Sequence, residues 1–185
     1  MTPEAPTEVL NQDDRSRFEA TVMPHLDAAY NLARWLLGGR SEAEDVTQDA
    51  ILRAYRFFNT FHSGDARAWL LQIVRNCCYT WLAKNRNWVD LGELDDASVP
   101  REKETPETLA ISGNDRERLA RALEQLSPHF REILVLRELE GCSYKEIAPI
   151  TSRPMGTIMS ALARARRQLR DLLTGPAKRE ARLEL

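Results

Sequence analysis

The sequence predicts an all-α protein made of two small helical domains joined by a flexible acidic linker. Strand signals are weak, because the chain has no long alternation of apolar and polar residues and no Asn-Gly or Asp-Gly hairpin turn. Apolar residues instead recur at helical spacing in three segments. A stretch that holds Pro100, Pro106 and a surplus of acids separates two of these segments from the third.

The 185 residues have room for one ordinary domain or two small ones. Residues 87–115 carry eight acidic side chains against Arg101 and Lys103, a composition that buries little apolar surface. We therefore predict five parts, which are a disordered N-terminus 1–13, a first domain 14–86, a linker 87–115, a second domain 116–174 and a loose tail 175–185.

Composition narrows the class of protein. No apolar run approaches the roughly 18 residues that a membrane span needs, and Met1 to Asp13 do not resemble a secretory signal. We expect a cytoplasmic protein without direct membrane insertion. The three cysteines lack CxxC spacing and the three histidines are scattered, so buried, reduced thiols are expected rather than a zinc site. No catalytic residue, metal or cofactor is predicted.

The first helical segment covers residues 42–58. Ser41 precedes three acids, a pattern typical of a helix N-cap and first turn. One face is apolar, and the opposite face carries Asp45, Gln48, Asp49, Leu52 and Arg56. A leucine framed by acids suggests a surface for a protein partner. A lone exposed leucine is also common in proteins without such a partner.

The second helical segment covers residues 66–86. Its predicted buried stripe consists of Leu70, Ile73, Val74, Cys77 and Trp81. Its predicted outward face consists of Gln72, Arg75, Asn76, Tyr79 and Arg86. Bases interleaved with amides and an aromatic ring suit single-stranded nucleic acid, which offers a phosphate and a π-face at each nucleotide. A solvated helix face fits the same pattern.

The third segment predicts a helix-turn-helix. A short helix over 143–150 leads into a turn at 151–154, and Pro154 lies just inside the start of a second helix. That helix buries Ile158, Leu162, Ala165, Leu169 and Leu172. It exposes Gly156, Ser160, Ala163, Arg164 and Arg167, and no acid occurs between Arg153 and Arg170. Small residues beside arginines favour close approach to the DNA major groove, although a helix pair in any bundle has a similar pattern.

These stretches resemble, in order and spacing, the extracytoplasmic-function (ECF) sigma factors of the sigma-70 family of bacterial RNA polymerase. SEAEDVTQDAILRAY (41–55) is similar to the helix that binds core polymerase. ARAWLLQIVRN (66–76) is similar to the part that opens and recognises the −10 element. LSPHFREILVLRELEGCSYKEIA (126–148) and PMGTIMSALARAR (154–166) are similar to the domain that recognises the −35 element.

The resemblance implies roles for particular residues. The core-polymerase surface, on the β′ clamp helices, would be formed by Asp45, Gln48, Asp49, Leu52, Tyr55 and Arg56. Capture of an extruded −10 base and contact with the melted strand would use Phe61, His62, Ser63, Asp65, Arg75, Asn76, Tyr79 and Arg86. Contact with −35 DNA would use Arg153, Thr157, Ser160, Arg164 and Arg167. The apolar face of the second domain would bind the β flap, and an anti-sigma factor, which in some cases is membrane-bound, would occlude both domains.

Three positions depart from the family pattern. Met159 and Ala161 stand where the family usually has basic residues, and each missing phosphate contact is expected to weaken DNA binding and its dependence on salt. Pro149 is unusual late in a helix, where proline tends to end or kink it.

Two other functions fit parts of the sequence. A helix-turn-helix regulator that acts without polymerase explains residues 126–170 equally well, but it gives no role to the predicted surfaces on 42–58 and 66–86. A metal-dependent hydrolase using Glu42, Asp45 and Asp49 lacks a nearby histidine and a second carboxylate helix.

Overall fold

The computed structural model describes residues 12–85 and 114–174, with the backbone alone for 114–116, and no strand occurs in these two ranges. The all-α prediction is confirmed. Arg86 and nearly all of the predicted linker and tail lie outside the described residues. The five predicted domain boundaries stay predictions.

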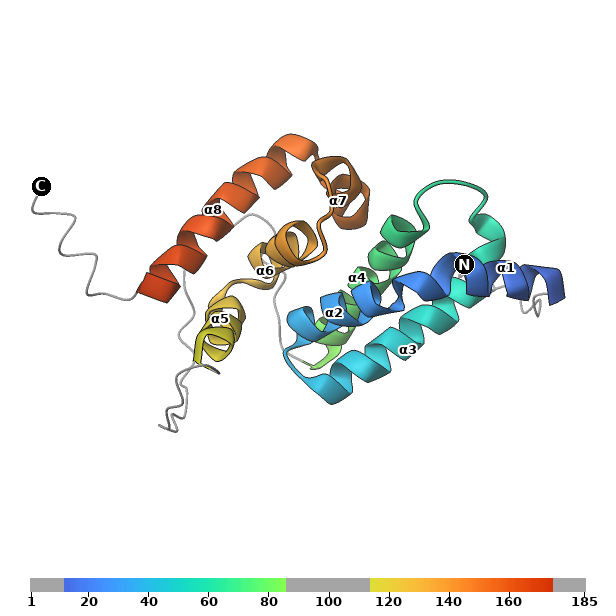
Figure 1. The fold of residues 1–185 in the computed structure, drawn as a ribbon, viewed down its shortest axis with the longest axis horizontal. Coiled ribbons are helices and arrows are strands. Elements are labelled where there is room, and N and C mark those ends of the chain that lie inside the picture. The colour runs from blue at the N-terminus through green and yellow to red at the C-terminus, as the bar shows by residue number, and fades with distance from the viewer. Residues whose placement is uncertain (1–11, 86–113, 175–185) are drawn as a thin grey trace, which may run out of the picture.

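The described residues form two groups of helices, which face each other in Figure 1. The first group consists of α1 (Gln12–Val22), a 3₁₀ turn (Met23–His25), α2 (Leu26–Leu37), α3 (Arg40–Phe57), a second 3₁₀ turn (Phe58–Thr60) and α4 (Ala66–Asn85). The second group consists of α5 (Asn114–Gln125), α6 (Pro128–Leu134), a π-helical turn (Val135–Leu139), α7 (Tyr144–Thr151) and α8 (Met155–Thr174). Helices α2, α3 and α4 pack on one another, as do α6, α7 and α8.

The corner between α2 and α3 is built on two glycines. Gly38 ends α2 in the left-handed conformation at φ 77° and donates its N–H to the Arg34 carbonyl. Gly39 is the N-cap of α3, and no side chain caps this end. The prediction that Ser41 is the N-cap is therefore wrong. The helix starts two residues earlier than predicted, with Arg40 in its first turn. The Nε of Arg40 lies 3.1 Å from Glu44 Oε1, one turn along the helix.

The helix-turn-helix prediction is confirmed. Ser143 accepts a hydrogen bond from the Glu146 N–H, and the Glu146 carboxylate accepts one from the Ser143 N–H, which forms a capping box at the start of α7. Ser152 ends α7 at φ 55°. Pro149 does not end the helix, which continues for two more residues, and Pro154 directly precedes α8.

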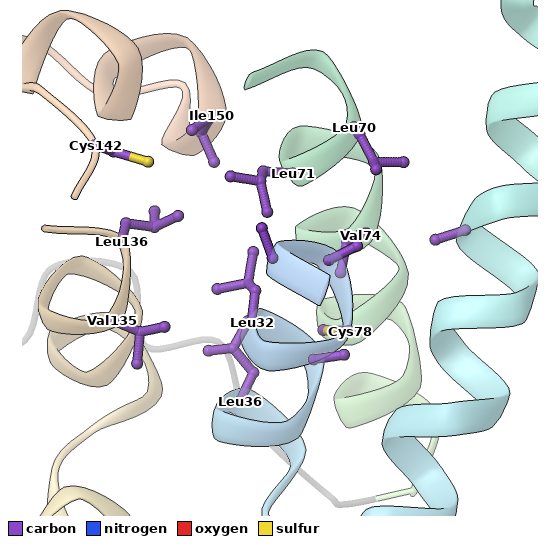
Figure 2. Packing of buried hydrophobic residues seen from close by; sticks show 14 of the residues in the cluster. Leu32, Leu36, Leu70, Leu71, Val74, Cys78, Val135, Leu136, Cys142 and Ile150 are labelled. Atoms are coloured by element: carbon purple, nitrogen blue, oxygen red, sulfur yellow. The ribbon is translucent and has the colours of Figure 1, made fainter. Parts of the chain in front are cut away.

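Buried apolar side chains form one cluster that continues from the first group of helices into the second. Figure 2 shows Leu71 of α4 beside Ile150 of α7, with Leu32 and Leu36 of α2 facing Leu136 and Val135 of the π-helical turn. Contacts of α4 with α7 and of α2 with α6 accompany this packing. The two domains are thus closed on each other by a shared core, and separating them would expose apolar surface to water.

Candidate nucleic-acid interface

Helix α3 presents the predicted polar face to solvent. Asp45, Gln48, Asp49 and Arg56 are exposed, and Leu52 is 55% exposed, the largest such fraction among the exposed large apolar side chains of the described ranges. Tyr55 lies at the edge of this face and is half-buried, because its ring packs edge-on against Phe18 with centroids 5.2 Å apart. The face is anionic toward its start and has a leucine at its centre.

The loop between α3 and α4 forms a shallow pocket of about 330 Å³. Four predicted −10 residues line it, namely Phe61, His62, Ser63 and Asp65. Its apolar wall is aromatic, since the rings of Phe61 and Trp69 lie 5.0 Å apart. A pocket with one aromatic wall and one polar wall suits a planar base. Pro149 of α7 also lines it, so the second domain forms part of this pocket.

Asp65 has a structural role in addition to its predicted one. Its Oδ1 accepts hydrogen bonds from the N–H groups of Arg67 (2.9 Å) and Ala68 (3.1 Å). These bonds satisfy donors that would otherwise lack partners at the start of α4. An aspartate directly before a helix is the sequence signal for this role, and the prediction gave the residue a role in DNA binding alone.

The outward face predicted for α4 does not point to solvent at two of its positions. Arg75 Nε donates a hydrogen bond to Glu132 Oε1 of α6, and Tyr79 Oη donates one of 3.1 Å to Glu132 Oε2. The Arg75 guanidinium also lies 4.5 Å from the centre of the Tyr79 ring. Burial and the charge of Glu132 raise the pKa of Tyr79, so its hydroxyl remains a donor. Asn76 is exposed on the same helix.

Arg131 of α6 is buried and closes the ends of two helices. Its guanidinium donates to the carbonyls of Leu123 (2.8 Å) and Glu124 (2.7 Å) at the end of α5. It also donates to those of Trp35 (3.0 Å) and Leu36 (3.4 Å) at the end of α2. Carbonyls in the last turn of a helix lack partners within the helix and carry partial negative charge, which a cation stabilises.

A further polar contact joins the domains near the start of α4. Arg67 Nη2 donates to the backbone carbonyl (2.6 Å) and to Oε2 (2.8 Å) of Glu140. Arg67 Nη1 also lies 3.7 Å from the Sγ of Cys142. None of Arg67, Arg131, Glu132 and Glu140 was among the predicted site residues. The sequence does contain one signal for Arg131 and Glu132. They interrupt an otherwise apolar stretch, and if that stretch is buried, each charged side chain needs a buried partner.

Helix α8 keeps its predicted outer face free. Thr157, Ser160, Ala163, Arg164 and Arg167 are all exposed. Its inner face buries Ile158, Leu162 and Ala165, with Leu169 and Leu172 half-buried. Met159 is 52% exposed, whereas Ala161 is 2% exposed and belongs to the core. Of the two positions where the family usually has basic residues, only Met159 therefore lies on the outer face.

Two other arginines near α8 have protein partners. Arg153, in the turn before α8, is exposed and its Nη1 lies 3.2 Å from His129 Nε2. Arg166 pairs with Glu138, with Nε 2.9 Å from Oε1. Arg164 and Arg167 project from the same face as Ser160, so the cations that flank the small residues remain available to a phosphate backbone.

The three cysteines are free and buried, as expected. Burial raises the pKa of each thiol, to about 11 for Cys142. Among the described residues, no three His, Cys, Asp or Glu side chains gather in a way that could hold a metal ion. No helix in the described ranges is long and apolar enough to cross a membrane.

Comparison with known proteins matches both halves of the chain. Residues 21–87 match the Sigma-70 region 2 family, and residues 116–169 match Sigma-70, region 4. The chain is 34% identical over 158 residues to the ECF RNA polymerase sigma factor SigE of Mycolicibacterium smegmatis, covering 84% of this chain and 61% of that protein. It is 30% identical over 176 residues to the ECF RNA polymerase sigma-E factor of Escherichia coli K12, covering 90% of this chain and 91% of the relative.

Solved structures agree with this match. The sigma factor RpoE in complex with the anti-sigma factor NepR from Bartonella quintana aligns with a TM-score of 0.68 at 27% identity, over 87% of this chain and 99% of that one. CnrH, solved in complex with the cytosolic domain of CnrY, has the same fold, with a TM-score of 0.64 at 24% identity over 86% and 89% of the two chains. Two sigma-70 regions in the same order, and a relative matched over nine-tenths of its length, place this chain in the family of ECF sigma factors of RNA polymerase.

Proposed function

We propose that this chain is an alternative sigma factor that binds core RNA polymerase, directs it to promoters through −10 and −35 contacts, and catalyses no reaction itself. The supporting observation is that one chain of this family presents two free surfaces of opposite character. The α3 face is acidic around an exposed leucine, and the α8 face is basic around small residues. A regulator that acts without polymerase has no use for the α3 face.

Core polymerase docks on α3. The centre of the contact is the exposed side chain of Leu52. The charges of Asp45 and Asp49 set the orientation of polymerase on α3. Gln48 completes the exposed face, with Tyr55 and Arg56 at its far end. The chemistry of this face suits a partner with a basic, partly apolar surface, and the β′ clamp helices are the part of polymerase that we assign to it.

Promoter DNA is held at two places. The aromatic-walled pocket at Phe61, His62, Ser63 and Asp65 takes the extruded −10 base, and Arg75, Asn76 and Tyr79 hold the adjacent melted strand. Arg86 extends this surface in our prediction and lies outside the described residues. In the duplex at −35, Ser160 and Arg164 approach bases, while Arg153, Thr157 and Arg167 hold phosphates.

We assign two further partners, one that binds the second domain and one that occludes both domains. A groove of about 510 Å³ between α6 and α8 is lined by Leu134, Leu169 and Leu173, with Glu138, Arg166, Arg170 and Thr174 at its rim. We assign this apolar groove to the β flap of polymerase. An anti-sigma factor, as in the RpoE–NepR complex, holds the chain inactive in the cytoplasm until a signal releases it.

A run-off transcription assay tests the proposal. The full chain plus core polymerase should give transcripts that start at defined promoters, whereas core polymerase alone should not. A chain that fails to join polymerase yet binds duplex operators tightly by itself would be a conventional regulator instead.

A matched pair of variants tests the docking surface. Leu52→Asp should abolish co-purification with core polymerase, because it places a charge at the centre of the apolar contact. Met23→Asp makes the same change at another exposed apolar side chain, away from α3, and should leave co-purification intact. Equal retention of core polymerase by both variants would show that α3 is not the docking surface.

A further inference from the structure

The α4 surface that we assign to the melted −10 strand already has an occupant in this structure. Glu132 reaches from α6 with its side chain fully buried, and both of its oxygens accept hydrogen bonds from α4. One donor is the Arg75 guanidinium and the other is the Tyr79 hydroxyl. Pro149 of α7 meanwhile lines the pocket that we assign to the extruded base.

A carboxylate and a phosphate require the same donors. A guanidinium binds either group through charge-assisted hydrogen bonds, and a hydroxyl adds a further donor. Glu132 needs these donors as well, because a buried carboxylate without them loses its hydration and gains nothing in return. The Nε–H of Arg75 and the hydroxyl of Tyr79 therefore cannot be donated to Glu132 and to a nucleic-acid strand at the same time.

Other contacts hold the second domain in this place. Arg67 binds Glu140 at one end of α4, and Arg131 reaches the carbonyls at the end of α2. Between them, Leu71 and Ile150 belong to the apolar core that the domains share (Figure 2). The closed arrangement therefore combines polar contacts at its edges with apolar burial at its centre.

We propose that the second domain is an internal competitor of promoter DNA, in which Glu132 occupies the Arg75–Tyr79 site and closes the free chain without help from another protein. This inference rests on the proposed function, because it takes Arg75 and Tyr79 to be −10 contacts. The chain exchanges between this closed form and an open form in which the two side chains are released. Polymerase and DNA bind the open form, so their apparent affinity falls in proportion to the closed fraction.

The chain contains its own reporter of opening. The Cys142 thiol is covered by Arg67 of the first domain, and its pKa of about 11 keeps it unreactive. Opening removes Arg67 and admits water, so the thiol reacts faster with a maleimide. Cys77 serves as the control in the same molecules, because it is buried in α4 and charged groups of α3, Arg53 and Asp49, are its principal electrostatic neighbours.

The first experiment measures the labelling rate of each cysteine in the free full-length chain by mass spectrometry of its peptides. Glu132→Gln removes the charge that binds Arg75 while keeping the side-chain shape, and Cys142 labelling should accelerate about tenfold or more. Cys77 labelling should not change. Unchanged Cys142 labelling in this variant would overturn the proposal.

A second variant guards against misfolding. If Glu132→Gln unfolds the chain, Cys77 also becomes fast, and the test passes to Glu140→Gln, which weakens the distant Arg67 contact. This substitution should accelerate Cys142 by a smaller factor and leave Cys77 slow. No acceleration in a folded Glu140→Gln chain would count against closure.

The second experiment measures the concentration of the chain that gives half-maximal run-off transcription with core polymerase. The Glu132→Gln chain should require severalfold less protein than the wild type, because more of it is open. An unchanged or higher requirement, together with fast Cys142 labelling, would show that closure occurs but does not compete with DNA. Absence of transcripts from the wild type would refute the proposed function alone, since the labelling experiment contains no polymerase.

Discussion

Helices α4 and α8 both carry arginines beside residues that suit nucleic acid, yet the arginines of α8 are exposed and Arg75 of α4 is covered by the other domain. Arg164 and Arg167 on α8 are exposed. Arg75 on α4 is bound by a carboxylate of the other domain. The same residue types in similar helical patterns thus give one surface that is open to DNA and one that is covered. The pattern along a helix indicates what a face can bind, whereas a distant segment decides whether that face is free.

Arg131 is one of the residues that join the second domain to the first, and its replacement should have the largest effect. Arg131→Met leaves carbonyls at the ends of α2 and α5 without their buried donor and should lower the free energy of unfolding by about 3 kcal/mol. Urea unfolding followed by circular dichroism measures it. Arg121→Met, on the exposed face of α5, should cost less than about 0.5 kcal/mol. Equal losses in the two variants would contradict a special role for Arg131.

Replacing an arginine by alanine on α4 and on α8 tests the difference between the covered and the exposed face directly. Arg75→Ala should lower the free energy of unfolding by about 2 kcal/mol, because Glu132 loses its cation and regains hydration only when the domains separate. Arg164→Ala should change that free energy by less than about 0.5 kcal/mol. A triple variant, Arg75→Met and Tyr79→Phe with Glu132→Leu, should recover most of the loss, since apolar side chains can replace a buried ion pair once no hydroxyl is left without its acceptor.

Arg164→Ala should instead affect DNA. If Arg164 makes a bidentate base contact, the polymerase holoenzyme should lose about 1–3 kcal/mol of binding at one −35 position. Competition binding with promoter variants at each −35 base pair measures this loss. A loss that is equal on all sequences would make Arg164 a phosphate contact.

The start of the helix-turn-helix offers a smaller, pH-dependent effect. The Ser143 hydroxyl and N–H lower the pKa of Glu146, so this carboxylate stabilises the folded state above its ordinary pKa, and the contribution is lost as the pH falls through the lowered value. Ser143→Ala should cost about 1 kcal/mol at pH 7 and less in acid, once the pH has fallen below the lowered pKa of Glu146. Thermal unfolding across this range checks it, with the exposed Ser160→Ala as the control.

The smallest effect concerns the salt dependence of binding at −35. Met159→Lys adds a cation to the exposed face of α8 and should steepen the slope of log K against log salt by about 0.9. Ala161→Lys places the same charge in the core and should destabilise the fold instead of steepening the slope. Equivalent behaviour of the two variants would contradict the placement of these neighbours on opposite sides of α8.

Local sequence patterns predicted much of the helical structure, because helix formation and capping depend on residues that are close together in the chain. The inner stripe of α8 and the capping sequence before α7 follow from helical spacing and hydrogen-bonding chemistry within a few residues. The exposure of Leu52 follows in the same way. Ser41 failed as an N-cap because Gly38 and Gly39 fix the corner two residues earlier than the acids suggested.

The covered state of Arg75 and Tyr79 could not be predicted in this way. Their partner is 57 and 53 residues distant along the chain, and no periodicity links the two positions. The adjacent charges of Arg131 and Glu132 within an apolar stretch indicated buried partners without saying which ones. The packing of one domain on the other supplied the identities.

The double attachment of Arg131 has a mechanical consequence for any motion between the domains. The carbonyls of Leu123, Glu124 and Leu126 belong to its own domain, and those of Trp35 and Leu36 lie across the boundary. When α2 moves away, the guanidinium therefore keeps its hydrogen bonds to its own domain and stays in the same orientation. When α2 comes back, the Arg131 side chain is already oriented toward its carbonyls. Little side-chain entropy is therefore lost when these hydrogen bonds form again, and the two domains can close quickly.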